Sequence, residues 1–166
     1  MTSGWQYFWP LFAASLVIGL ISGLVAFRRT TEGRRRVIGI GIAAALASAM
    51  LWHWPLGAAG RFAAAVEKEA RFVLVDWEMG NVTAQLQRGP MTRRVELAGP
   101  ADKFQRRQLA RLMTLVPGVG GATWSKSRGM PLVGEGLSLS LLGFLVGLVL
   151  AYILELRRRH NSQWTW

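Results

Sequence analysis

"PLVGEGLSLSLLGFLVGLVLAYILEL", residues 131–156, carries only two charged side chains, Glu135 and Glu155, one near each end. A helix rises 1.5 Å per residue, so roughly 20 apolar residues cross the hydrocarbon core of a bilayer. Two other runs qualify: residues 1–27 contain no charged side chain, and residues 37–60 contain none unless His53 is protonated. Three such runs in 166 residues leave too little polar chain to cover them in water. The sequence therefore predicts an α-helical membrane protein with three transmembrane helices, at residues 5–27, 37–57 and 132–156.

Arginine clusters predict the orientation, because short basic loops resist translocation and stay in the cytoplasm. The loop at residues 28–36 holds five arginines and one glutamate, and the tail at residues 157–166 opens with three arginines. Both are predicted to be cytoplasmic, which leaves the N-terminus and the central segment, residues 58–130, on the periplasmic side of an inner membrane. Arginine outnumbers lysine 17 to 3, and with abundant Ala and Gly this favours a GC-rich bacterial genome.

Aromatic side chains that prefer the headgroup level fit the same orientation. Those predicted at the outer interface are Trp5, Tyr7, Trp9, Trp52 and Trp54, and those predicted at the inner one are Tyr152, Trp164 and Trp166.

Small residues recur at four-residue spacing in each predicted span, an arrangement that lets helix backbones approach closely in lipid. The three ribbons are Ser15, Gly19 and Gly23; Gly39, Ala43 and Ala47; and Gly143, Gly147 and Ala151. The candidate helix-packing residues are Gly19, Gly23, Gly143 and Gly147. Packing within the chain, contact with another subunit and no specific role all remain open.

In the central segment, the spacing of apolar residues changes to that of helices and strands in a water-soluble fold. Residues 58–70 read as a helix, and "RFVLVDWEMGN" as a strand with Val73, Val75 and Trp77 on one face. "NVTAQLQ" and "RRVELAG" alternate as two further strands, a helix starts near Ala101, "PGVGG" ends it, and "ATW" adds a short last strand. The prediction is a small α+β two-layer domain.

The second helix of this domain is predicted to be amphipathic. The predicted apolar face consists of Phe104, Leu109, Leu112, Met113 and Val116. The other face is basic, with Lys103, Arg106, Arg107 and Arg111. Because anionic headgroups attract such clusters, these four are the candidate lipid-binding residues; a plainly solvated face is an equal alternative. Nucleic acid shares the electrostatic preference, but the extracytoplasmic location argues against it.

The strand ending in "VELAGPA", the polar helix at residues 102–115 and "VPGV" at residues 116–119 together resemble the BON domain, a small bacterial envelope module. The match rests on Val95, Leu97, Gly99 and these two segments, and covers residues 62–124. The resemblance implies a noncatalytic domain outside the cytoplasmic membrane that contacts phospholipid surfaces or partner proteins.

We find no pattern typical of catalysis, nucleotide binding or metal binding. Cysteine is absent, and the two histidines, His53 and His160, are predicted on opposite sides of the membrane. Ala49 and His53 match the A-x-x-x-H spacing of light-harvesting polypeptides, which would make His53 a pigment or haem ligand; an interfacial histidine without a ligand is the favoured interpretation. No cofactor and no metal are predicted.

The predicted function is therefore that of a noncatalytic inner-membrane protein that presents a BON-like domain to lipid headgroups or to an envelope protein. The alternative is an accessory or scaffolding subunit of a larger photosynthetic, respiratory or secretory membrane complex.

Overall fold

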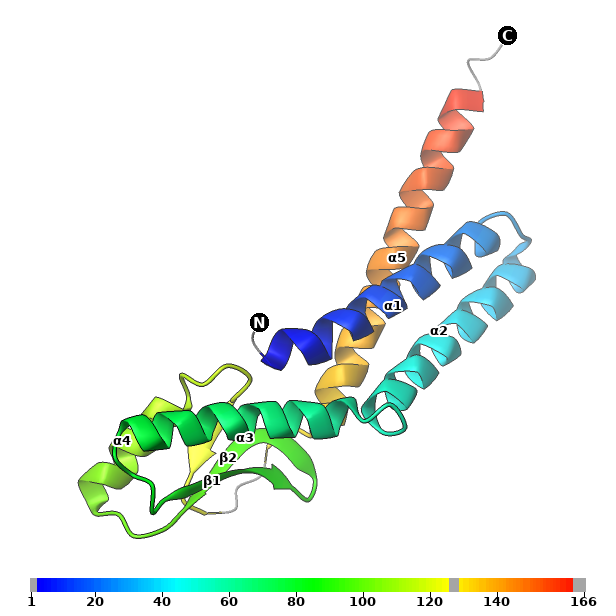
Figure 1. The fold of residues 1–166 in the computed structure, drawn as a ribbon. Helices are drawn as coiled ribbons and strands as arrows, with labels where there is room; N and C mark the ends of the chain where they lie inside the picture. The colour runs from blue at the N-terminus through cyan, green and yellow to red at the C-terminus, as the bar shows by residue number, and fades with distance from the viewer. Residues whose placement is uncertain (1–2, 126–128, 163–166) are drawn as a thin grey trace. The chain divides into compact units, whose positions relative to one another are not determined.

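The computed structural model describes residues 3–125 and 129–162, with only the backbone described for residues 3–5. In chain order the elements are α1 (Ser3–Ala26), α2 (Thr31–His53), α3 (Ala58–Asp76), β1 (Thr83–Arg88), β2 (Met91–Ala98), α4 (Lys103–Met113), β3 (Gly121–Thr123) and α5 (Leu132–Ser162) (Figure 1). They form two compact units. The α/β unit comprises Met1–Tyr7 and Gly57–Glu135, and the helical unit comprises Phe8–Leu56 and Gly136–Trp166.

In the described part of the chain, three helices are long and apolar enough to cross a membrane, as the sequence predicts. These segments are Gln6–Ala26, Thr31–His53 and Leu132–Ser162, and an 18-residue window in each has a mean hydropathy of 2.0, 1.4 and 2.5, respectively. α5 continues beyond the predicted end at Leu156, because the arginine-rich segment that follows is also helical. Trp164 and Trp166 lie outside the described residues, as does the side chain of Trp5.

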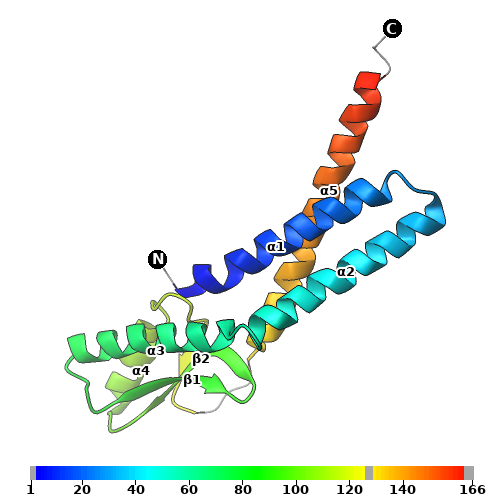
Figure 2. The same ribbon diagram turned by 45° about the vertical axis from the view of Figure 1, so that its right-hand side comes forward.

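α1 and α5 pack in parallel through their glycines (Figures 1 and 2). A Cβ at Gly143 would lie 2.7 Å from the Phe12 carbonyl oxygen, and one at Gly147 would lie 2.6 Å from the Leu20 nitrogen. Cβ atoms at Gly19 and Gly23 would collide with the Phe144 carbonyl and the Ala151 side chain. Such contacts are possible only where a side chain is missing, so all four glycines pack helices within the chain.

α2 runs antiparallel to α1 and buries a ribbon other than Gly39, Ala43 and Ala47. The buried residues are Gly41, Ala45, Ala49 and His53. Gly39, Ala43 and Ala47 are exposed, and a Cβ at Gly39 would meet nothing within 4 Å. Both ribbons repeat every four residues, and spacing alone cannot say which side of a helix meets a neighbour.

Two serines join the three helices at the centre of the helical unit. Ser15 of α1 and Ser140 of α5 are both 0% exposed, and their Oγ atoms lie 2.7 Å apart. Ser140 Oγ also donates to the Ala45 carbonyl of α2, at 3.0 Å. A buried hydroxyl without a partner would be costly in an apolar bundle, so this relay favours one register of the three helices.

The α/β unit is a three-stranded sheet of order β1-β2-β3 with α3 and α4 packed on it. β1 and β2 are antiparallel, with Leu86 opposite Val95, and β3 runs parallel to β2. Leu86, Val95 and Leu97 are at most 2% exposed, whereas Thr83 and Gln85 are open to solvent. The two strands predicted from their alternation are thus confirmed as a half-buried hairpin.

The strand predicted at "RFVLVDWEMGN" is wrong, because α3 continues through it to Asp76. The buried side of α3 includes Phe62, Val66, Ala70 and Leu74, one every four positions. Val75 and Trp77, predicted to share one face of that strand, are 63% and 56% exposed. The helical period of the whole segment therefore overrides the β propensity of its valines.

Tyr7, predicted at the headgroup level, is a buried side chain: it is 2% exposed, and its ring centroid lies 5.7 Å from that of Phe62 in α3. The start of α1 thus contributes to the core of the α/β unit. Trp9 and Trp54 are 50% and 61% exposed, and His53 packs edge-on against Trp54.

Candidate functional site

α4 begins at a capping box that the sequence reasoning did not identify. The Gln105 backbone N–H donates to Asp102 Oδ1 at 2.7 Å, and the Asp102 N–H donates to Gln105 Oε1 at 2.9 Å. The signal was the D-x-x-Q spacing ahead of an amphipathic run. The box fixes where the helix begins and hence which side chains face the sheet.

The buried side of α4 holds Leu109 and Met113, and Val116 follows in the next turn. The candidate lipid-binding residues Lys103, Arg106, Arg107 and Arg111 are all exposed, as predicted from the helical period. Among the described residues, none of the four forms an ion pair with a carboxylate. α4 therefore presents uncompensated positive charge to its surroundings.

Arg106 differs from the other three, because its side chain contacts residues outside α4. Its Nε donates to the Ala101 carbonyl at 3.0 Å, and its guanidinium lies 5.1 Å from the centroid of the Trp124 ring. Trp124 Nε1 in turn donates to the Arg106 carbonyl at 2.9 Å. Arg106 thus ties α4 to the segment after β3, in addition to carrying charge.

Phe104 was predicted to pack on the sheet, and this is wrong: its side chain is 64% exposed. Five residues at 100° each place Phe104 about 140° from Leu109, on the opposite side of the helix. Its neighbours there are Arg107 and Arg111, at i+3 and i+7. Leu115, just beyond the helix, is 76% exposed. We call Phe104, Arg107, Arg111 and Leu115 the α4 outer stripe: two arginines bracketed by two exposed apolar side chains.

The loop after α4 is anchored to the sheet by Arg93 of β2. Arg93 Nε donates to the Gly118 carbonyl at 3.0 Å, its carbonyl accepts from the Gly120 N–H at 2.7 Å, and its Nη1 lies 3.2 Å from Glu135 Oε2. Gly118 has a φ of 96°, a conformation that glycine adopts without strain. These bonds hold the "VPGVGG" loop, and with it the end of α4, against the sheet.

A groove of about 620 Å³ lies between α3 and the edge strand β1, with Glu67, Lys68 and Arg71 among its lining residues. The carboxylate of Glu67 in this groove already has a structural role. Its Oε1 accepts from the Leu86 N–H at 3.1 Å, and its Oε2 lies 3.0 Å from Arg88 Nη2. In the described part of the chain, no cluster of three His, Asp or Glu side chains could hold a metal ion.

His53, the candidate pigment or haem ligand, is 6% exposed and lies in line with Ala49 on the buried side of α2. The prediction of an interfacial histidine without a ligand concerns depth in a bilayer and stays a prediction. His160 is exposed in the last turn of α5.

Comparison with known proteins gives no match: no family model, no curated protein and no solved structure is similar to this chain.

Proposed function

We propose that this chain is a noncatalytic membrane protein whose α/β unit docks on an anionic lipid surface through the α4 outer stripe. The observation that carries the proposal is the composition of that stripe: two exposed arginines between Phe104 and Leu115, which are 64% and 76% exposed. Arginines bind headgroup phosphates, while the apolar side chains enter the boundary with the acyl chains. A merely solvated helix face has no need of an exposed Phe and Leu.

The three apolar helices support this function by keeping the α/β unit near a bilayer. Both ends of the unit continue into segments long and apolar enough to span it. Attraction is worth roughly 1 kcal/mol per close basic residue, so a few arginines on a separate domain would bind weakly. Tethering converts this weak binding into an intramolecular contact at high effective concentration.

The location that we propose is a bacterial inner membrane, with the α/β unit in the periplasm and the arginine-rich ends in the cytoplasm. It rests on the distribution of arginines between short and long segments. The resemblance to the BON domain points to the same compartment and to the same kind of contact with phospholipid.

The test uses the chain reconstituted in nanodiscs. Because the chain has no cysteine, Phe104→Cys accepts a single nitrobenzoxadiazole dye, whose emission shifts to the blue in an apolar environment. We expect a blue shift and quenching by brominated lipid in phosphatidylglycerol discs, weaker in phosphatidylcholine and reversed by salt. A dye at Gln85→Cys, on the open face of the sheet, is the matched control and should not respond.

Replacement of Arg107 and Arg111 by Gln should reduce the response at position 104, while circular dichroism shows the fold intact. Arg106 is left in place because it also supports Trp124. An equal response at positions 104 and 85, or one that is independent of lipid charge, would rule out docking through α4.

A second candidate function is that of an accessory subunit of a larger membrane complex. The observation that favours it is the ribbon Gly39, Ala43 and Ala47, which α2 leaves exposed and which would let another membrane helix approach closely. Extraction in a mild detergent separates the candidates, because an accessory subunit would comigrate with its assembly and a lipid-docking protein would not.

A further inference from the structure

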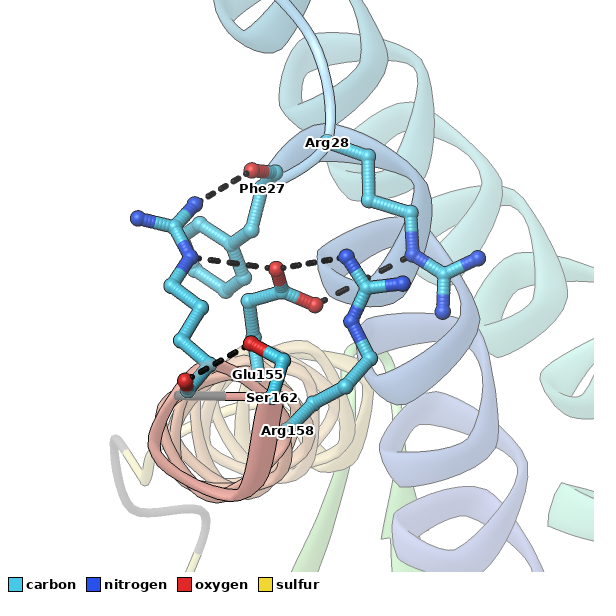
Figure 3. Close-up of polar contacts among 6 residues, drawn as sticks. Phe27, Arg28, Glu155, Arg158 and Ser162 are labelled. Carbon is cyan, nitrogen blue, oxygen red and sulfur yellow. Dashed lines mark hydrogen bonds and ion pairs between the residues drawn. The ribbon is translucent and has the colours of Figure 1, made fainter. Parts of the chain in front are cut away.

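A second cluster of arginines lies in the helical unit, where the ends of α1 and α5 meet (Figure 3). Its centre is Glu155, whose side chain is 5% exposed. Glu155 Oε1 accepts from Arg158 Nη2 at 3.1 Å and from Arg159 Nε at 3.2 Å. Arg28, which follows α1, approaches the other oxygen with its Nε 3.9 Å from Oε2.

The buried carboxylate organises this cluster but neutralises only part of it. Three arginines surround one glutamate, which leaves an excess of two positive charges. Arg159 Nη2 also donates to the Phe27 carbonyl at 3.3 Å, which joins the end of α1 to α5. The guanidinium groups thus converge from α5 and from the turn after α1, and are held there by side chains and backbone of the same chain.

Two features show that guanidinium N–H groups of these arginines are still available to bind an anion. Among the described residues, none donates a hydrogen bond to the buried Glu155 Oε2, since Arg28 at 3.9 Å is beyond hydrogen-bond distance. The guanidinium of Arg28 is therefore drawn to the carboxylate without being bonded to it. The side chains of Arg28, Arg158 and Arg159 remain 54%, 59% and 64% exposed, so N–H donors of the cluster face outward.

The position along the helices indicates which anion fits. The cluster directly follows the apolar span Gln6–Ala26. On α5 it is preceded by side chains that are half exposed, namely Tyr152, Ile153 and Leu154. In a bilayer, this boundary between apolar and basic surface lies at the level of the lipid phosphates. An anion bound there can carry acyl chains that lie along the apolar helices.

We propose that Arg28, Arg158 and Arg159, organised by Glu155, form a binding site for the phosphate of an anionic phospholipid. Arginine forks match phosphate oxygens with paired N–H donors. The excess of two positive charges favours a lipid with net negative charge over a zwitterionic one, whose own cation would be repelled. The site is in the helical unit and is separate from the α4 outer stripe.

The test measures lipid binding to the purified, delipidated chain by native mass spectrometry, with phosphatidylglycerol, phosphatidylcholine and glycerol phosphate as probes. We expect phosphatidylglycerol to bind at least tenfold more tightly than phosphatidylcholine, which corresponds to about 1.4 kcal/mol. Glycerol phosphate, which has the same anion without acyl chains, should not compete at equal concentration. If it competes fully, the site takes a soluble phosphate and the lipid assignment is wrong.

Arg157 provides a matched control, because it is an exposed arginine next to Arg158 that is not part of the Glu155 network. Arg28→Gln and Arg159→Gln should each weaken phosphatidylglycerol binding about tenfold, and Arg157→Gln less than twofold. Equal losses in all three variants would mean general electrostatic attraction and would overturn the proposal.

Glu155→Ala also distinguishes an organised site from general electrostatic attraction, since it raises the net positive charge but removes the carboxylate that organises the arginines. We expect weaker phosphatidylglycerol binding in this variant, with circular dichroism showing intact helices. Tighter binding would indicate attraction by net charge alone, contrary to an organised site.

Discussion

The hydroxyl protons of Ser15 and Ser140 can be assigned from the geometry alone. A carbonyl oxygen only accepts, so Ser140 must donate its single proton to Ala45. Ser15 must then be the donor in the 2.7 Å contact with Ser140. Ser140 is thus the centre of the relay, and its loss removes two interhelical bonds, whereas loss of Ser15 removes one.

We therefore predict that Ser140→Ala destabilises the helical unit about twice as much as Ser15→Ala. Interhelical hydrogen bonds in membranes contribute about 0.6 kcal/mol each, so the expected losses are roughly 1.2 and 0.6 kcal/mol. Reversible unfolding in mixed micelles measures both. Ser48→Ala is the control, because Ser48 bonds to the same Ala45 carbonyl from within α2. Equal losses for the two serine variants would contradict the assignment.

Replacement by alanine should have different effects on stability at two glycines, Gly147 and Gly39. Gly147→Ala places a methyl group against the backbone of α1, 2.6 Å from the Leu20 nitrogen, and should destabilise the helical unit by about 1 to 3 kcal/mol. Gly39→Ala enters open space and should be neutral or slightly stabilising. The same unfolding assay compares them. A large loss at Gly39 would mean that a second copy or another span covers this ribbon.

At the scale of elements, α3 ends in a Schellman motif that has a glutamate where glycine is usual. The Met79 N–H donates to the Leu74 carbonyl at 2.8 Å and the Glu78 N–H to the Val75 carbonyl at 3.0 Å. This geometry requires the left-handed backbone seen at Glu78, with a φ of 56°. A side chain in this conformation costs about 1 to 2 kcal/mol.

Glu78→Gly should therefore stabilise the α/β unit by roughly 0.5 to 1 kcal/mol, the relief of strain being offset in part by the greater freedom of glycine in the unfolded chain. Glu69→Gly, in the middle of the same helix, should instead cost about 1 kcal/mol. Hydrogen exchange of α3 amides reports both effects. A loss of protection in the Glu78 variant would show that the side chain has a stabilising role that outweighs the strain.

Elements with one unambiguous period could be predicted from the sequence, and the others could not. The apolar runs and the alternating hairpin are correct because length or period 2 leaves no competing arrangement. The strand expected at "RFVLVDWEMGN" rests on the alternation of Val73, Val75 and Trp77, whereas the buried positions of α3 repeat every four residues. Phe104 shows the same limit within a helix: its apolar character suggested burial, but its angular position places it outside.

The pairing of the helices depends on contacts between distant residues, which the spacing of residues along one helix does not predict. The choice between the two ribbons of α2 depends on which side Ser140 and Phe144 of α5 approach. The sequence marks Glu155 only as a charge near one end of an apolar run, and its proximity to Arg28, distant in the chain, is a property of the fold.

At the scale of the whole molecule, the contacts within the helical unit constrain the path of the chain through a membrane. Phe12 meets Gly143, Gly23 meets Ala151, and Arg28 meets Glu155, so α1 and α5 run in the same direction. The basic loop after α1 and the basic end of α5 therefore lie at the same end of this unit. The tendency of short basic segments to stay in the cytoplasm predicts one compartment for both, and a common end of the helical unit is compatible with that prediction.

This agreement yields a prediction for single cysteines in the cysteine-free chain. In spheroplasts, a membrane-impermeant maleimide should label Gln85→Cys in the α/β unit directly, and Thr31→Cys and Asn161→Cys only after permeabilisation. All three native side chains are exposed. The reverse pattern, with 31 and 161 labelled and 85 protected, would keep the three spans but invert their orientation. If positions 31 and 161 label on opposite sides, α1 and α5 cannot both span in parallel, and the lipid site at Glu155 cannot form from their ends.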